Sequence, residues 1–148
     1  MKIKIIKPIE MATLEVYADR AALMEQADRA GKSALHLIEQ AVTAKMEREY
    51  VPARPYHIIT ISASPKLHAD IQAVTKGRRM SAFFRQLALG ALGKFPPIPK
   101  DLEKIEMEAP VSLINRIESS ASMAEMPIWL YVQKALDEYE DSPAREGE

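Results

Sequence analysis

The chain contains, in three variants, the pattern of Gly31-Lys32-Ser33-Ala34-Leu35-His36-Leu37-Ile38-Glu39-Gln40-Ala41-Val42. The second variant ends in Phe83-Phe84-Arg85-Gln86-Leu87-Ala88 and the third in Tyr131-Val132-Gln133-Lys134-Ala135-Leu136, so the period is 46 and then 48 residues. Repeats of this length are supersecondary units that cannot bury their apolar face alone, and each therefore needs a neighbour. The repeat predicts three small units rather than one ordinary domain of 148 residues.

Each unit is expected to contain a short strand followed by two helices. In the middle unit, residues 56–63 are rich in β-branched side chains and alternate between two faces, as a strand does. Ser64-Pro65 then provides a cap and a first helical residue, Gly77 ends that helix, and a second helix covers about residues 80–92. The fold class that follows is mainly α with short β-strands, arranged as three tandem β-α-α modules.

The first and third units fit the same scheme. In the first unit the strand is either residues 2–7 or residues 11–17, and we favour 11–17 because its spacing to Gly31 matches the middle unit. In the third unit residues 104–109 alternate apolar and charged side chains, which predicts a half-buried strand. The predicted modules are residues 1–52, 53–95 and 100–140, followed by a polar tail, residues 141–148, that we expect to be disordered.

Charge is distributed unevenly over the three units, although the whole chain carries a net charge of −1. Residues 53–100 contain 8 basic side chains and one acidic side chain, Asp70, which leaves a balance of +7. Residues 101–148 contain 4 basic and 12 acidic side chains, a balance of −8, while residues 1–52 contain 8 of each. This asymmetry predicts that the middle unit meets an anion and that the third unit does not.

The composition argues against catalysis and against metal or cofactor binding. The chain has no cysteine, and His36, His57 and His68 fall in three different elements without carboxylates at ligand spacing. The sequence has no phosphate-cradling glycine loop and no serine–histidine–aspartate arrangement, so we do not expect an enzyme. No apolar run is long enough to cross a bilayer, and the first residues lack the apolar centre of a secretory signal, so we expect a cytoplasmic protein without membrane contact.

A strand, a helix, a glycine turn and a second helix with this apolar pattern resemble the ribbon-helix-helix family of DNA-binding proteins, which includes Arc and the methionine repressor. The resemblance is carried by residues 31–42 and 77–85, and more weakly by the third unit, where Glu125 replaces the turn glycine and Pro127 the capping serine. In that family two modules pair their strands into an antiparallel ribbon, and four helices cover one face of it. The other face enters the DNA major groove, and the start of each second helix contacts a phosphate.

The resemblance implies a set of DNA contacts in the first two units. Base-reading positions would be Ile58, Thr60 and Ser62 in the middle unit, with Thr13 and Tyr17 in the first unit. Phosphates would be held by the following residues: Arg54, Lys76, Arg78, Arg79 and Ser81 in the middle unit, and Lys32 and Ser33 in the first. In the third unit the strand would present Glu106 and Glu108, which are unfavourable beside DNA.

Three strands cannot all pair within one chain, because an unpaired strand leaves a row of backbone groups without partners. We therefore expect a homodimer. The favoured arrangement pairs the first and middle units within the chain and uses the third unit for dimerisation, through Ile105, Met107, Trp129 and Tyr131. The alternative pairs each unit with its counterpart in the other chain.

The sequence thus predicts a dimeric protein that binds double-stranded DNA at specific sites. It would act as a transcriptional repressor or regulator, or as an accessory factor in plasmid transfer or partition. The alternative is an antitoxin-like or adaptor protein whose acidic third unit binds a protein partner. A further interpretation is a helical scaffold that binds no nucleic acid. Binding that weakens steeply with salt would favour the DNA interpretation.

Overall fold

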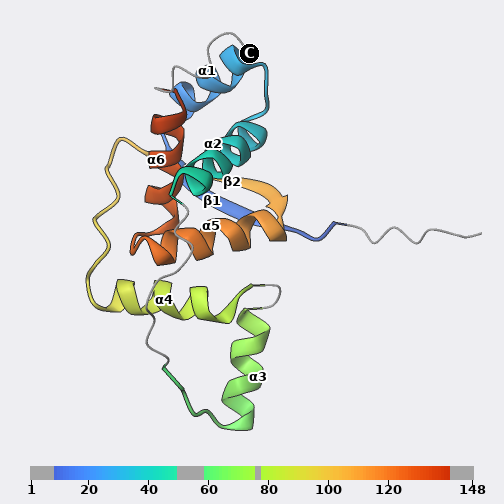
Figure 1. Cartoon of the computed structure of the whole chain (residues 1–148), viewed down its shortest axis with the longest axis vertical. Helices are drawn as coiled ribbons and strands as arrows, with labels where there is room; N and C mark the ends of the chain where they lie inside the picture. Colours follow the sequence, from blue (N-terminus) through green and yellow to red (C-terminus); the bar gives the residue numbers. More distant parts are fainter. Residues whose placement is uncertain (1–8, 50–58, 76–77, 141–148) are drawn as a thin grey trace, which may run out of the picture.

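The computed structural model describes residues 9–49, 59–75 and 78–140 of the chain. The elements, in order, are β1 (Met11–Ala18), α1 (Arg20–Ala30), α2 (Ala34–Arg48), α3 (Pro65–Val74), α4 (Met80–Ala91), β2 (Glu103–Pro110), α5 (Val111–Met123) and α6 (Ile128–Glu140). Strands β1 and β2 form a two-stranded antiparallel sheet, and the described residues contain no other strand (Figure 1). The protein is therefore mostly helical around one short ribbon.

The ribbon has one buried and one exposed face, because side chains alternate along each strand. Leu14 lies opposite Met107, and Val16 lies opposite Ile105. Leu14, Val16 and Ile105 are almost completely buried, and Met107 packs against the same cluster. In the first unit the strand β1 covers residues 11–18, where the favoured prediction placed it at 11–17. The alternative strand, residues 2–7, and the polar tail, residues 141–148, lie outside the described ranges.

The core is built from matching positions of the first and third units. These positions lie 94 residues apart in the sequence, and each of their side chains is at most 4% exposed: Leu37 and Tyr131, Ile38 and Val132, Ala41 and Ala135, Val42 and Leu136. Helix α2 packs along α6, and both α5 and α6 contact the ribbon. The two β-α-α units therefore bury each other's apolar faces. We call β1, α1, α2, β2, α5 and α6 together the paired core.

A charged cluster closes the side of this core between α2 and α6. The Nζ atom of Lys45, whose side chain is almost fully buried, donates to Glu49 at 2.6 Å and to Glu138 at 3.0 Å. Burial lowers the pKa of Lys45, but the hydrogen bonds that it donates to Glu49 and Glu138 outweigh burial and raise that pKa overall. Arg48 adds a bond to Glu138 at 2.6 Å. The cluster therefore ties the first unit to the third across their shared interface.

The turns between the helices of the two paired units share a left-handed backbone. Gly31 has a φ of 67°, and its N–H group donates to the carbonyls of Ala27 and Asp28. The equivalent residue of the third unit, Glu125, has a φ of 57° although it carries a side chain. A residue with a Cβ costs roughly 1 kcal/mol more than glycine in this conformation. The third unit therefore keeps the turn of the repeat at some cost in stability.

The expectation of three β-α-α modules was wrong. Residues 59–64 form no strand, and β1 pairs with β2, so the first unit is joined to the third and not to the middle one. The physical reason is that β1 and β2 satisfy each other's backbone groups, which leaves a segment in the middle of the chain without a strand to pair with. We call helices α3 and α4 the middle helix pair; α4 packs on α5 of the paired core, and α3 projects away from it (Figure 1).

Candidate nucleic-acid interface

The exposed face of the ribbon is acidic. It carries the following side chains: Thr13, Glu15 and Tyr17 from β1, and Lys104, Glu106 and Glu108 from β2. The Nζ atom of Lys104 lies 3.2 Å from Glu106 and 3.4 Å from Glu15, and the hydrogen bonds that it donates to these two carboxylates raise its pKa. Three carboxylates against one ammonium group leave this surface, which we call the acidic face, with negative charge. Such a surface repels a phosphate backbone.

The two base-reading candidates on this face already have partners within the chain. The hydroxyl of Thr13 donates to Glu108 at 3.5 Å, and the ring of Tyr17 stands edge-on to Trp129 with centroids 6.5 Å apart. Glu15 projects between them from the same side of the strand. The position of Thr13 and Tyr17 therefore gives little support to a DNA contact through the paired ribbon.

The residues assigned to dimerisation are used inside one chain. Ile105 and Tyr131 belong to the buried core, and Met107 packs against it. Burial raises the pKa of the Tyr131 hydroxyl, and the ammonium group of Lys45 lies 5.4 Å from its ring. Trp129, at the start of α6, contacts Tyr17 across the edge of the ribbon. Ile105 and Tyr131 are thus buried between the first and third units, whereas Met107 and Trp129 stay partly exposed beside the same contact.

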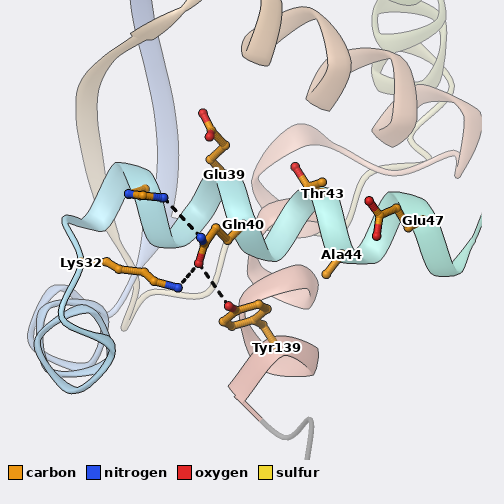
Figure 2. A pocket seen from close by; sticks show the side chains of 8 residues that line it. Lys32, Glu39, Gln40, Thr43, Ala44, Glu47 and Tyr139 are labelled. Carbon is orange, nitrogen blue, oxygen red and sulfur yellow. Dashed lines mark hydrogen bonds between the residues drawn. The ribbon is translucent and has the colours of Figure 1, made fainter. Parts of the chain in front are cut away.

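The start of α2, the phosphate site expected in the first unit, is closed by local contacts. Ser33 caps the helix by accepting from the N–H of His36 at 3.1 Å. Lys32 donates to Gln40, which also accepts from the hydroxyl of Tyr139 at 3.2 Å (Figure 2). The ammonium group of Lys32 lies 5.9 Å from the centre of the Tyr139 ring. Lys32 therefore links α2 to the end of α6, in a shallow pocket that Glu39 and Glu47 also line.

The two arginines before α4 have different surroundings. Arg78 binds Glu118 of α5 through two bonds, one of them from Nε at 3.3 Å, and the Glu118 side chain is only 1% exposed. Arg78 also stacks over the Phe83 ring at 4.9 Å. Arg79 is exposed, and its one described bond, to Ser119, is 3.4 Å long. Arg78 is thus an anchor between α4 and α5, whereas Arg79 keeps most of its donors for another partner.

A groove runs between α2, α4 and α5 beside Arg79, and we call it the arginine groove. It is lined by Thr43, Met46, Glu47, Arg79, Arg116, Ser119 and Ser120. Arg116 crosses it and donates to Thr43 at 3.3 Å. The start of α4 has no side-chain cap, so the first N–H groups of this helix add positive potential near Arg79. Two guanidinium groups, three hydroxyls and a helix start can hold a phosphate. The one carboxylate that the described residues bring to the groove, that of Glu47, offsets only part of this positive charge.

Arg116 was missed by the sequence analysis, although the chain contains a signal for it. Residues 116, 119 and 120 are spaced to lie on one face of a helix, which brings an arginine and two serines together. Among the other candidates, Thr60, Ser62 and Ser81 are exposed. Arg54, Ile58 and Lys76 lie outside the described residues. Among the described residues, Arg79 is therefore the one expected phosphate contact that shares a groove with a second arginine.

Within the described ranges, no three histidine, aspartate or glutamate side chains are arranged to hold a metal ion. In the same part of the chain, no helix combines the length and apolar character needed to cross a bilayer. Comparison with family models, with curated proteins and with solved structures gives no match to this chain. Its chemistry is therefore argued from its own residues.

Proposed function

We propose that the protein binds double-stranded DNA through its middle unit and the arginine groove beside it. The observation that carries the proposal is the meeting of Arg79 and Arg116 in one groove at the uncapped start of α4. Arg79 belongs to a segment, residues 53–100, with a balance of +7, and Arg116 adds a positive charge from α5 of the third unit. A polyanion is the partner that such a surface attracts most strongly, and phosphate contacts dominate DNA affinity.

The proposal assigns different roles to the exposed residues of the middle unit. Arg79 and Arg116 would hold a backbone phosphate, which positions the protein without reading sequence. Thr60 and Ser62, both exposed, would contact base edges, since their hydroxyls can donate and accept. A regulator of transcription, or a factor that organises plasmid DNA, is the kind of protein that fits this role.

Salt titration of DNA binding tests the proposal. In a fluorescence anisotropy assay with a duplex of mixed sequence, Arg79→Ala together with Arg116→Ala should lower the slope of log affinity against log salt by about 2, because each lost phosphate contact removes roughly one released counterion. The control is Arg20→Ala, which removes one positive charge from the exposed Arg20–Glu103 pair of the paired core, away from the groove. Unchanged slope and affinity in the double variant would refute the assignment of the groove.

The specificity of the contact needs a second measurement. Selection from a random oligonucleotide pool should give a consensus site for the parent protein, and Thr60→Ala should change one position of that consensus while leaving the salt slope alone. A variant in which both Arg78 and Arg79 are replaced would mix the loss of a DNA contact with the loss of an anchor, because Arg78 holds α4 to Glu118. The two arginines are therefore better tested separately.

A second candidate function rests on the acidic face. Glu15, Glu106 and Glu108 present negative charge on an exposed ribbon, which suits a basic segment of a protein partner. Removing the third unit would not test this, because β2, α5 and α6 are half of the paired core. Charge reversal at exposed positions, Glu106→Lys with Glu108→Lys, is the suitable variant. Loss of a co-purifying basic protein in this variant, with DNA binding retained, would favour the adaptor function.

A further inference from the structure

Helix α4 is apolar on opposite sides. Its inner side buries Ala82 and Leu89, and α4 packs on α5. Its other side, which we call the outer stripe, carries Met80, Phe84, Leu87, Ala88 and Ala91 at helical spacing. Leu87 is 53% exposed and Met80 is 37% exposed. A helix with apolar side chains on opposite sides is normally covered on both, but Leu87, Ala88 and Ala91 of the outer stripe stay exposed among the described residues.

Helix α3 and the segment before it carry further exposed apolar side chains. None of the α3 side chains is buried, and Val74 is 63% exposed. Leu67 on α3, with Ile59 and Ile61 before it, is also largely exposed. Figure 1 shows α3 projecting away from the paired core. Single exposed apolar residues are ordinary, but so many on neighbouring elements mark an interaction surface.

The repeat indicates what covers this surface. Leu87 corresponds to Ala41 and Ala135, which are completely buried where the first and third units meet. Ala88 corresponds to Val42 and Leu136, which are buried in the same contact. In the paired core, each helix pair covers the other at these positions. The middle helix pair has the same apolar pattern, but both helix pairs that could cover it are already engaged with each other.

We propose that a second copy of the chain covers the outer stripe and α3, so that two middle helix pairs pack face to face about a twofold axis. A self-complementary surface of this kind is the commonest route to a homodimer. The interface would differ from the one expected at Trp129 and Tyr131, which is used within the chain. The proposal goes beyond DNA binding, because it concerns the protein in the absence of nucleic acid.

Charge makes the two proposals separable. Two middle units of balance +7 repel each other when they meet, so added salt should strengthen self-association by screening. The same salt should weaken DNA binding. A chain that dimerises but does not bind DNA would leave the interface standing and remove the proposed function. A chain that binds DNA but stays a monomer at every concentration would leave the proposed function standing and remove the interface.

Sedimentation equilibrium of the full chain without DNA is the direct test. From roughly 1 µM upward we expect a mass of twice 16.6 kDa. Leu87→Asp should raise the dissociation constant by about 100-fold or more, because both copies lose a buried leucine and gain a buried carboxylate. The control is Met24→Asp, the same kind of change at an exposed methionine of α1, 39% exposed, which should leave the dissociation constant unchanged. Circular dichroism of both variants checks that they fold.

Cross-linking gives an independent readout. Because the chain contains no cysteine, Leu87→Cys and Met24→Cys each provide one thiol per chain. Oxidation should yield a covalent dimer rapidly for Leu87→Cys, with thiols near the twofold axis, and slowly for Met24→Cys. A monomer mass throughout the concentration range, or equal effects of the changes at positions 87 and 24, would overturn the proposal.

Discussion

The contact between Arg78 and Glu118 makes a prediction about how the middle helix pair is held. Replacing Arg78 with alanine leaves the Glu118 carboxylate, 1% exposed, without the guanidinium that satisfies it. Removing one partner of a buried ion pair costs about 3–5 kcal/mol. The lower end applies here, because the Arg78 side chain is 34% exposed and water can reach the vacated space. Loss of the stacking on Phe83 adds roughly 0.5 kcal/mol, which brings the cost to about 3.5 kcal/mol.

This cost should fall on α4 and not on the whole protein. Besides the Arg78 pair, α4 is held to the paired core by Ala82, by Leu89 and by a bond of 2.9 Å from Gln86 to the carbonyl of Met126. The contact between α2 and α6 involves none of these residues. In Arg78→Ala, the amide groups of α4 should therefore exchange roughly 400-fold faster, while α2 and α6 exchange as in the parent.

Two variants test whether the Arg78–Glu118 pair anchors α4. Arg79→Ala removes the neighbouring arginine, whose only described bond is long and exposed, and should change protection by less than about 0.5 kcal/mol. Arg78→Ala combined with Glu118→Ala should recover part of the loss, since the second change removes the unpaired carboxylate. Unchanged exchange in α4, or an equal loss in α2 and α6, would refute the anchor and mean that α4 is held by apolar packing alone.

Two further predictions concern the paired core. Burial works against ionisation of Glu138, but hydrogen bonds donated by Lys45 and Arg48 outweigh burial and hold the Glu138 pKa below the usual 4.5. The stability that this lowered pKa supplies is complete above pH 4.5 and is lost as pH falls through the lowered pKa. In urea titrations, Glu138→Gln should therefore show a smaller drop in unfolding midpoint than the parent between about pH 6 and about pH 3, and equal drops would argue against the cluster. Glu125→Gly should relieve the left-handed turn and raise the free energy of unfolding by roughly 0.5–1 kcal/mol, whereas Gly31→Ala should lower it by a similar amount. Chemical denaturation measures both changes. A lower free energy of unfolding in Glu125→Gly would mean that the left-handed backbone at residue 125 does not cost stability.

The local elements were predictable because short-range physics determines them. The alternation of residues 104–109 indicated β2, and Ser33 and Ser64 cap α2 and α3 as their sequence context predicts. The pairing of the strands was not predictable, because all three units present a similar apolar pattern and nothing local selects among the possible partners. Once the first and third units pair, the middle one is left without a strand partner in the chain.

The candidate site shows the same division between local and long-range information. Charge balance pointed to the middle unit, but it could not separate Arg78 from Arg79, which are adjacent and identical. Their roles depend on Glu118 and Ser119, which lie 40 residues further along the chain and reach α4 only through the packing of α4 on α5. Arg116 enters the arginine groove for the same reason. A sequence pattern can find such residues only after the helix contacts are known.

The separation of charge between the units has a structural consequence. The paired core carries its negative charge on the exposed face of the ribbon, and the middle helix pair attaches on the side of α5. On the proposed function, a duplex bound at the arginine groove would be repelled by the acidic face, so the protein has one favourable orientation on DNA. The third unit would then contribute to binding in two ways without reading any base: it buries the first unit, and its Glu118 holds the arginine-bearing start of α4 in place.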